Sequence, residues 1–137
     1  MENLDRFVMA QERTYDVALQ EIRNGGKRSH WIWYVFPQLR GLGRTANANY
    51  YGIEGKEEAV AYLGHEILGK RLREISNELL NSQEDIRVLM GSGIDVLKLK
   101  SSMTLFDFVS PGDVFGLVLD KFFDGKRCRR TLEILST

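Results

Sequence analysis

The stretch LDRFVMAQERTYDVALQEIRN, residues 4–24, decides the fold class because its apolar side chains recur at helical spacing. Each of them lies three or four residues from another member of the set: Leu4, Phe7, Val8, Tyr15, Ala18, Leu19 and Ile22. This spacing predicts an amphipathic helix with one apolar face. Gly25 and Gly26 then end it, since glycine is favoured just after a helix.

Helical patterns continue beyond this segment, and the chain contains only two prolines. Residues 56–63 and 65–81 predict two helices that meet at Gly64. The second has an apolar face made of Leu68, Leu72, Ile75 and Leu79. Two segments stay ambiguous: residues 31–36 suit a helix or a short strand, and GRTANANYYGIEG, residues 43–55, suits a short helix or a turn.

The remaining helices are placed by their start signals. SQED at 82–85 opens a short helix, and SPGD at 110–113 supplies a serine cap with a proline at the first helical position. The helix after SQED is expected to end at Met90, and the helix after SPGD to cover residues 112–123. Between them, a further helix is expected from about Asp95 to Val109. A last short helix is expected within GKRCRRTLEIL at the end of the chain. The sequence therefore predicts one all-α domain over residues 1–137 with seven or eight helices.

Composition excludes several classes of protein. Nineteen basic residues balance nineteen acidic ones, so no overall field attracts nucleic acid or membranes. The longest apolar run, 31–37, is too short to span a bilayer. The single cysteine is consistent with a reducing cytoplasm, and the acidic N-terminus does not resemble a signal peptide. Two histidines and one cysteine give no metal-ligand spacing, so we expect no metal and no cofactor.

A candidate binding site lies in GGKRSHWIWYVFPQLRGLGR, residues 25–44. Lys27, Arg28, Ser29 and His30 stand at the expected start of the segment 31–36. Free N–H groups and the dipole of a helix attract anions at such a start, and arginine binds phosphate or carboxylate through two contacts. Ser29 is also expected to cap this helix.

The aromatic and polar residues that follow extend the same candidate site. Trp31 and Trp33 offer flat faces for a base or sugar and an N–H group each, and Gln38 and Arg44 could reach the same cleft. Clustered aromatic side chains are more often core, however. We assign residues 34–36 to the core and leave both tryptophans open between core and pocket.

A second candidate segment is KLKSSMTLFDF, residues 98–108. Small polar side chains inside a helix bring no gain in helix propensity, so they need another explanation. Lys100, Ser101, Ser102 and Thr104 either pack closely against a neighbouring helix or face a cavity. Met103, Leu105 and Phe106 are expected in the core.

The tail DGKRCRR, residues 124–130, places four cations within five positions. A solvated basic patch is the simplest interpretation, and contact with nucleic acid is the alternative. The neighbouring arginines would lower the pKa of Cys128 if it is exposed, but no histidine is near in sequence and we assign it no catalytic role. The chain has no phosphate-binding loop, nucleophile elbow or dinucleotide fingerprint.

Five segments together carry a family resemblance: LDRFVMAQ, GGKRSHWIWYVFPQLRGLGR, YLGHEILGKRL, LKSSMTLFDF and VLDKFFDGKRCRRTLEIL. In this order they resemble the bacterial family called domain of unknown function 1810, over nearly the whole chain. The resemblance implies a mainly helical fold and no established activity. The chain departs from the family near Cys128, where an acidic residue is common.

A fainter similarity links YLGHEILGKRLREI and GSGIDVLKL to the YbiA-like (NADAR) proteins. That similarity implies ligands such as ADP-ribose and riboflavin precursors, and cleavage of N-glycosidic bonds. The Ser-x-Glu-His segment of those proteins has no counterpart here.

Three functions compete on these observations. The first is a pocket for an anionic small molecule such as a nucleotide, ADP-ribose or a sugar phosphate, with or without hydrolysis of an N-glycosidic bond. The second is a protein-interaction or homodimeric structural domain. The third is a weak nucleic-acid-binding module that uses residues 27–28 and 126–130. Whether the chain is an enzyme stays open at this point.

Overall fold

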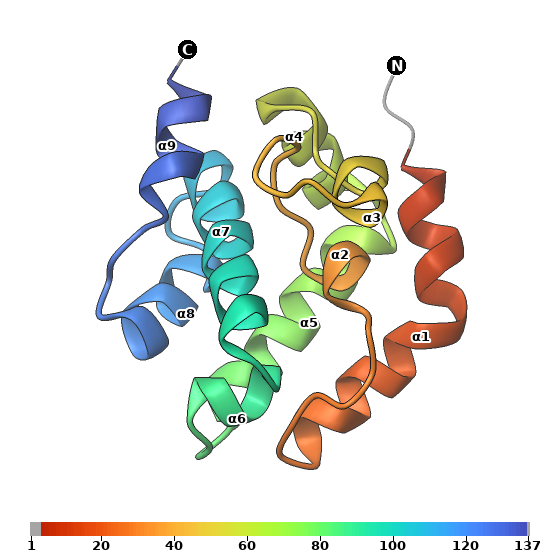
Figure 1. Cartoon of the computed structure of the whole chain (residues 1–137), viewed down its shortest axis with the longest axis vertical. Coiled ribbons are helices and arrows are strands. Elements are labelled where there is room, and N and C mark those ends of the chain that lie inside the picture. Colours follow the sequence, from red (N-terminus) through yellow and green to blue (C-terminus); the bar gives the residue numbers. More distant parts are fainter. Residues whose placement is uncertain (1–3, 137) are drawn as a thin grey trace.

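The computed structural model describes residues 4–136, and this part of the chain forms nine helices (Figure 1). Their bounds are α1 Asp5–Arg23, α2 Ile32–Val35, α3 Ala46–Tyr50, α4 Lys56–Gly64, α5 Leu68–Asn81, α6 Ile86–Met90, α7 Gly93–Val109, α8 Val114–Phe123 and α9 Arg129–Leu135. Between residues 4 and 136 the only strand-like pairing is an isolated bridge between Leu39 and Ile53. The all-α prediction is confirmed, with one helix more than the upper expectation.

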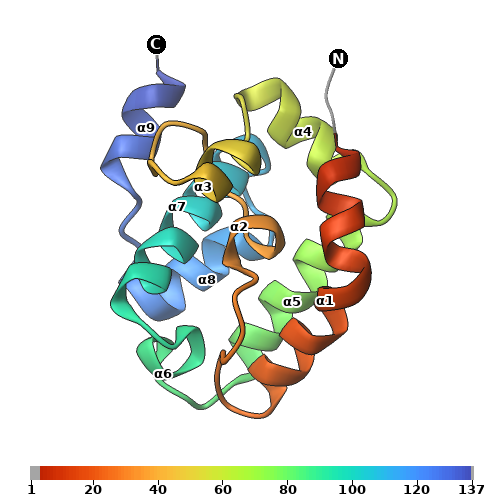
Figure 2. The same cartoon turned by 45° about the vertical axis from the view of Figure 1, so that its right-hand side comes forward.

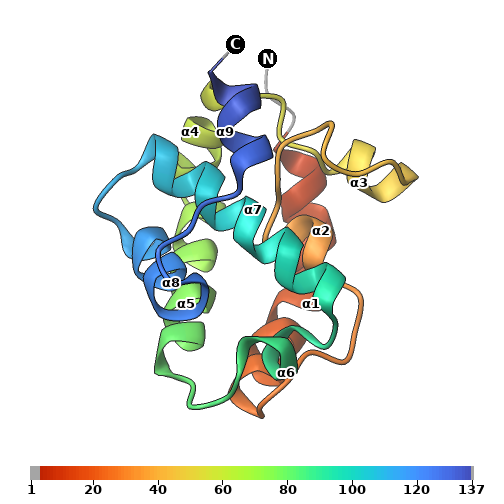
Figure 3. The ribbon, with the colours of Figure 1, turned by 60° about the vertical axis from the view of Figure 1, so that its left-hand side comes forward.

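Helix α7 is the centre of the fold. It packs against α2, α4, α6, α8 and α9, and Figures 2 and 3 show neighbours on several of its sides. Its residues 101–106 are all buried, which leaves no solvent face along this part of the helix. A helix that is covered on every side does not need an amphipathic pattern. The central position of α7 therefore explains why residues 101–106 show no amphipathic pattern.

Helix α1 lies beside α5 and also contacts α2 (Figure 2). The predicted apolar face of α5 is confirmed, because Leu68, Leu72, Ile75 and Leu79 are at most 1% exposed. The short helix α2 contacts both α1 and α7, so it bridges the two. This position brings the residues that precede α2 close to the beginning of α7.

A chain of aromatic rings crosses the core. The ring of Tyr62 on α4 lies 5.2 Å from that of Phe7 on α1 and 5.3 Å from that of Phe106 on α7. Phe106 in turn lies 5.7 Å from Phe115 on α8. Such tilted and edge-to-face pairs add about 0.5–1.5 kcal/mol each beyond the area they bury. They connect four helices, α1, α4, α7 and α8.

Three predicted helix starts are corrected by the structure. Helix α8 begins at Val114 with Asp113 as its N-cap, so Ser110 and Pro111 belong to the preceding turn. Helix α7 begins two residues before the expected Asp95, because the Ser92 hydroxyl accepts the N–H of that residue. Helix α5 begins at Leu68 rather than at 65.

The later start of α5 has a local cause. His65 Nδ1 accepts the N–H groups of Ile67 and Leu68 at 3.1 and 3.3 Å. This side chain satisfies donors that would otherwise be unpaired at the beginning of the helix. His65 therefore has a structural role, and the hinge predicted at Gly64 lies at the last residue of α4.

Candidate functional site

Glu21, on α1, holds the loop between α1 and α2 by accepting four hydrogen bonds. Its Oε1 accepts from the backbone N–H groups of Arg28 and Ser29 at 2.8 and 3.0 Å and from Trp31 Nε1 at 2.9 Å. Its Oε2 accepts from Ser29 Oγ at 2.6 Å. Burial raises the pKa of this carboxyl, but the four donors lower it by more, so the pKa falls to about 2.

Sequence analysis did not single out Glu21, although one signal was present. The residue lies in the last turn of α1, where the helix dipole disfavours an acid. An acidic side chain at that place needs compensation, and the four donors provide it.

The prediction that Ser29 caps α2 is wrong. Helix α2 begins at Ile32, has Trp31 as its N-cap and receives no side-chain capping bond. The Ser29 hydroxyl and the N–H groups of Arg28 and Ser29 bond to Glu21 instead. An internal carboxylate thus occupies the N–H groups that sequence analysis assigned to an external anion.

The side chains of Lys27 and Trp31 are buried and contact other parts of the protein. Lys27 Nζ lies 2.8 Å from Asp95 Oδ2, and the two side chains are only 6% and 15% exposed. Lys27 also lies 5.2 Å from the centre of the Trp31 ring. Trp31 is 1% exposed, so the choice left open for it is decided in favour of the core.

A pocket of 270 Å³ lies between this loop and the segment that joins α6 to α7; we call it the loop pocket. Its lining residues are Lys27, Arg28, His30, Ile32 and Trp33 from the first segment, and Met90, Gly91, Ser92, Ile94 and Asp95 from the second. The structure thus brings together four of the predicted site residues: Lys27, Arg28, His30 and Trp33. The side chains of Arg28 and His30 are exposed at its edge.

Close contact between the two segments fixes the shape of the loop pocket. The Lys27 N–H donates to the Leu89 carbonyl at 2.8 Å. Gly91 has a φ of +84°, and a Cβ atom at this position would lie 2.9 Å from the Lys27 carbonyl oxygen. Only glycine combines this backbone conformation with so close an approach.

Trp33 is the aromatic wall of the loop pocket. Its indole nitrogen is buried and has no hydrogen-bond partner among the residues described. Lys98 Nζ, from α7, lies 4.9 Å from the centre of its ring. A buried N–H without a partner costs about 1–3 kcal/mol, so this group would gain from any acceptor atom that reached it.

Gln38 and Arg44 do not line the loop pocket. Gln38 lies on a much smaller pocket of 10 Å³, which shares Ile32 and Trp33 with the loop pocket and is also lined by Lys98. Arg44 is exposed in the connection before α3 and lines neither pocket. The candidate segment 25–44 is therefore divided between two sides of Trp33.

Residues 100–104 also lie away from the loop pocket. Ser101 Oγ lies 3.3 Å from Cys128 Sγ, and Thr104 Oγ1 accepts the Cys128 N–H at 2.9 Å. Ser102 is fully buried, and Lys100 Nζ lies 6.0 Å from the ring of Phe123 on α8. Close packing against α8 and α9 therefore explains residues 100–104. Within the segment 98–108, the lysine that reaches Trp33 is Lys98. Sequence analysis did not select Lys98 as a ligand contact.

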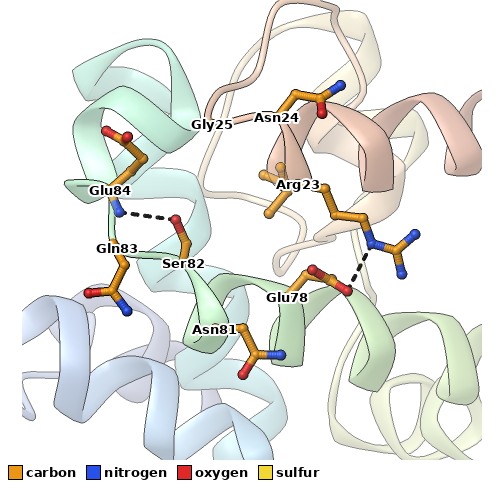
Figure 4. A pocket seen from close by; sticks show the side chains of 9 residues that line it. Arg23, Asn24, Gly25, Glu78, Asn81, Ser82, Gln83 and Glu84 are labelled. Atoms are coloured by element: carbon orange, nitrogen blue, oxygen red, sulfur yellow. Dashed lines mark hydrogen bonds and ion pairs between the residues drawn. The ribbon is translucent and has the colours of Figure 1, made fainter.

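A pocket of 390 Å³, larger than the loop pocket, was not predicted (Figure 4). It lies between the end of α1 and the end of α5, where Arg23 Nε donates to Glu78 Oε1 at 2.9 Å. Its charged lining residues are Arg23, Glu78 and Glu84, so two carboxylates face one cation. This excess of negative charge makes it unsuitable for an anion.

No group of three or more His, Cys, Asp or Glu side chains in residues 4–136 could hold a metal ion. No helix in the same range is both long and apolar enough to cross a membrane.

The fold and sequence place this chain among small all-helical proteins that share one architecture. It belongs to the family described as "Protein of unknown function (DUF1810)", which matches residues 1–135. The crystal structure of the conserved hypothetical protein Rv1873 from Mycobacterium tuberculosis is 45% identical to it, with a TM-score of 0.93. That match covers 98% of this chain and 96% of the other.

No curated protein matches the chain. These comparisons add no support to the fainter similarity to the YbiA-like proteins. The loop pocket therefore has to be interpreted from its own chemistry.

Proposed function

We propose that the protein binds an anionic small molecule, of the size of a nucleotide or sugar phosphate, in the loop pocket. The observation that carries the proposal is the meeting of cations and an aromatic ring around one cavity. Arg28 and His30 are exposed at its edge, and Trp33 forms its wall. Its charged lining residues are two cations, Lys27 and Arg28, and one carboxylate, Asp95, which leaves a net positive charge.

Each residue of the loop pocket receives a separate role in this proposal. Arg28 binds the phosphate or carboxylate group through its two-pronged guanidinium, because its side chain carries no internal ion pair among the described residues. Trp33 stacks on a flat ring or donates its unpaired indole N–H. Lys27, Ser29 and Trp31 hold the loop in shape instead of contacting the ligand.

The volume of the loop pocket limits the ligand. Sites for drug-sized ligands usually measure about 300–1,000 Å³. At 270 Å³, the loop pocket would enclose a mononucleotide or a sugar phosphate and leave part of a larger ligand such as ADP-ribose outside.

The proposal is limited to binding. Cleavage of a glycosidic bond generally uses two carboxyl groups, one as an acid and one as a base or nucleophile. Among the residues that line the loop pocket, Asp95 is the only carboxylate, and it is paired with Lys27. The loop pocket therefore lacks the second carboxyl group that hydrolysis of an N-glycosidic bond would need.

A thermal-shift panel of nucleotides, ADP-ribose and sugar phosphates tests the proposal. A ligand at a hundred times its Kd stabilises the folded state by about 2.7 kcal/mol, which is an easily measured increase in Tm. Arg28→Ala should abolish this shift. Arg44→Ala is the matched control, because it removes an exposed arginine of the same segment that does not line the pocket. An equal shift in both variants, or silence across the panel, would reject the proposal.

A second candidate function is a protein-interaction face. Val88 on α6 and Ile94 and Leu97 on α7 are 52%, 68% and 64% exposed. Ile94 and Leu97 are three residues apart on one helix and so share a face, and exposed apolar patches are found at interfaces between proteins. Sedimentation velocity over a hundredfold concentration range tests the homodimeric form of this candidate. Self-association that Leu97→Lys abolishes would favour the homodimer. A protein that stays monomeric at every concentration would exclude the homodimer.

Nucleic-acid binding through the basic tail has less support. Arg127 donates to Asp107 Oδ2 at 3.0 Å, so one of its four cations is paired within the protein. The remaining cations leave a small exposed patch, which suits a solvated surface.

A further inference from the structure

Cys128 is the single cysteine of the chain and immediately precedes α9. It is partly exposed and lies against the buried middle of α7. Two segments noted in the sequence, 98–108 and 124–130, meet at this residue. Ser101, Thr104 and Cys128, which meet here, do not line the loop pocket.

Ser101 supplies a hydroxyl to the sulfur. Its Oγ lies 3.3 Å from Cys128 Sγ and 3.1 Å from the Leu97 carbonyl oxygen. A serine hydroxyl has one hydrogen, so it can be directed to only one of these acceptors at a time. A thiolate is a stronger acceptor than a neutral carbonyl oxygen or thiol, because charge strengthens a hydrogen bond. Ionisation of Cys128 would therefore draw this hydrogen to the sulfur.

Thr131 gives a second, independent indication. Its side chain is 0% exposed, and its Oγ1 has no hydrogen-bond partner among the described residues. The hydroxyl nevertheless stands close enough to the sulfur to lower the pKa of the Cys128 thiol. An unpaired buried hydroxyl destabilises the folded state, and this cost is removed once the sulfur becomes an acceptor.

We propose that Cys128 is a reactive thiol that a hydroperoxide oxidises reversibly to a sulfenic acid. Ser101 and Thr131 are the hydroxyl groups that hold the thiolate and then the oxidised sulfur. This site is separate from the loop pocket and does not depend on the function proposed for that pocket.

The chemistry balances with one external oxidant and one external reductant. The thiolate sulfur attacks one oxygen of the hydroperoxide, the S–O bond forms, and the O–O bond breaks. The departing alkoxide or hydroxide takes up a proton from water. Because the chain has no second cysteine, a small external thiol then forms a mixed disulfide and releases water. A second external thiol restores Cys128 and leaves as the disulfide of the small thiol.

The acidity of Cys128 agrees with this role. Burial raises the pKa of the thiol, but Ser101, Thr131 and the first backbone N–H groups of α9 together lower it below its ordinary value. Thiolate character and partial exposure are the two properties that make a cysteine susceptible to oxidation.

The rate of alkylation by iodoacetamide as a function of pH tests the thiolate. Each alkylation reports on Cys128, because the chain has no other cysteine. The midpoint should lie below about 8.5, the value of an ordinary cysteine. Ser101→Ala and Thr131→Val should raise it, whereas Ser82→Ala, at the C-cap of α5, should not. A midpoint at or above the ordinary value, or one that neither variant moves, would overturn the proposal.

Both variants should fold, because they remove single hydroxyl groups and keep small or matched side-chain shapes. Thr131→Val is the sharper of the two. If the Thr131 hydroxyl is purely structural, its loss should leave the alkylation midpoint unchanged. If it holds the thiolate, its loss should raise the midpoint without lowering Tm.

Hydrogen peroxide tests the oxidation itself. Intact-mass analysis should show addition of one oxygen that a sulfenic-acid-specific dione traps and that dithiothreitol reverses. The four methionines can also take up oxygen, so Cys128→Ser is the control. Equal oxygen uptake in the control, with no trapped product in the native chain, would refute the peroxide reaction.

Discussion

At the scale of single residues, Glu21 has the largest influence on the shape of the candidate site. It binds two backbone N–H groups, a hydroxyl and an indole N–H, and so it fixes the loop that carries Arg28 and His30. Hydrogen bonds to a charged acceptor contribute more than those between neutral groups. The loop is therefore held by an ionised carboxylate that lies outside the quoted motif.

Glu21→Gln should lower the free energy of unfolding by about 1–2 kcal/mol at pH 7, allowing for the partial exposure of the site. The folded-state pKa is about 2 and the ordinary value is 4.5, so the stabilisation is complete above about pH 4.5 and is lost as the pH falls towards 2. Urea denaturation at several pH values should show the difference between the two proteins shrinking in this range. Glu12→Gln, an exposed change on the same helix, is the control; a Glu21→Gln difference that is constant with pH would contradict this explanation.

The ion pair between Arg6 and Glu58 is the most deeply buried in the described residues, with side chains 4% and 5% exposed and 3.0 Å between Nη2 and Oε1. Arg6 also donates to the carbonyl oxygens of Tyr50 and Gly52, and so ties α1 to the connection before α4. Glu58→Ala should destabilise by about 3–5 kcal/mol, because it removes the carboxylate that lies against the buried Arg6 guanidinium.

The double variant Arg6→Met with Glu58→Leu provides the comparison. Replacing both partners by apolar side chains of similar size is often close to neutral, so it should lose less stability than Glu58→Ala alone. Denaturant midpoints of the three proteins measure this, and a double variant that loses more than the single one would show that the ion pair itself is the main contribution.

At the scale of helices, the central position of α7 predicts where substitutions are costly. Met103 is fully buried, and Met103→Ala should cost about 2–5 kcal/mol through lost burial and the cavity it leaves. Leu97, on the same helix, is 64% exposed, and Leu97→Ala should change stability by less than about 0.5 kcal/mol. Equal losses in thermal or urea denaturation would contradict the central position of this helix.

Helices with one apolar face were predicted best. The spacing in 4–24 and the apolar face of α5 identified these helices because each has a solvent face and a core face. Helix α2 is a single turn, which is too short for periodicity to define. The N-cap Asp113 and the role of His65 depended on local hydrogen bonds that several polar residues of each segment could have made.

The candidate site was predicted in part for the same reason. Lys27, Arg28, His30 and Trp33 are adjacent in sequence, so a local pattern was enough to group them. The expected partner block at 100–104 was wrong for the loop pocket, because periodicity gives the buried face of a helix but not the neighbour it meets. Glu21 and Asp95 act through contacts distant in sequence, which a motif does not reveal.

At the scale of the whole molecule, a neutral chain divides its charge unevenly. The loop pocket, where α2, α6 and α7 come together, has an excess of positive charge, and the cleft between α1 and α5 has an excess of negative charge. The proposed anion site therefore depends on local arrangement, since the net charge is zero. Its affinity should fall as salt screens the exposed Arg28.

The indole N–H signals in a ¹H–¹⁵N NMR titration test the proposed site most directly. The chain has two tryptophans, so two such signals are expected. The Trp31 N–H is already bonded to Glu21, whereas the Trp33 N–H has no partner among the described residues. Titration with AMP or ribose 5-phosphate should move the Trp33 signal, leave that of Trp31 nearly unchanged, and have no effect in Arg28→Ala. Unmoved signals at millimolar ligand, or equal shifts in Arg28→Ala, would contradict an anion site in the loop pocket.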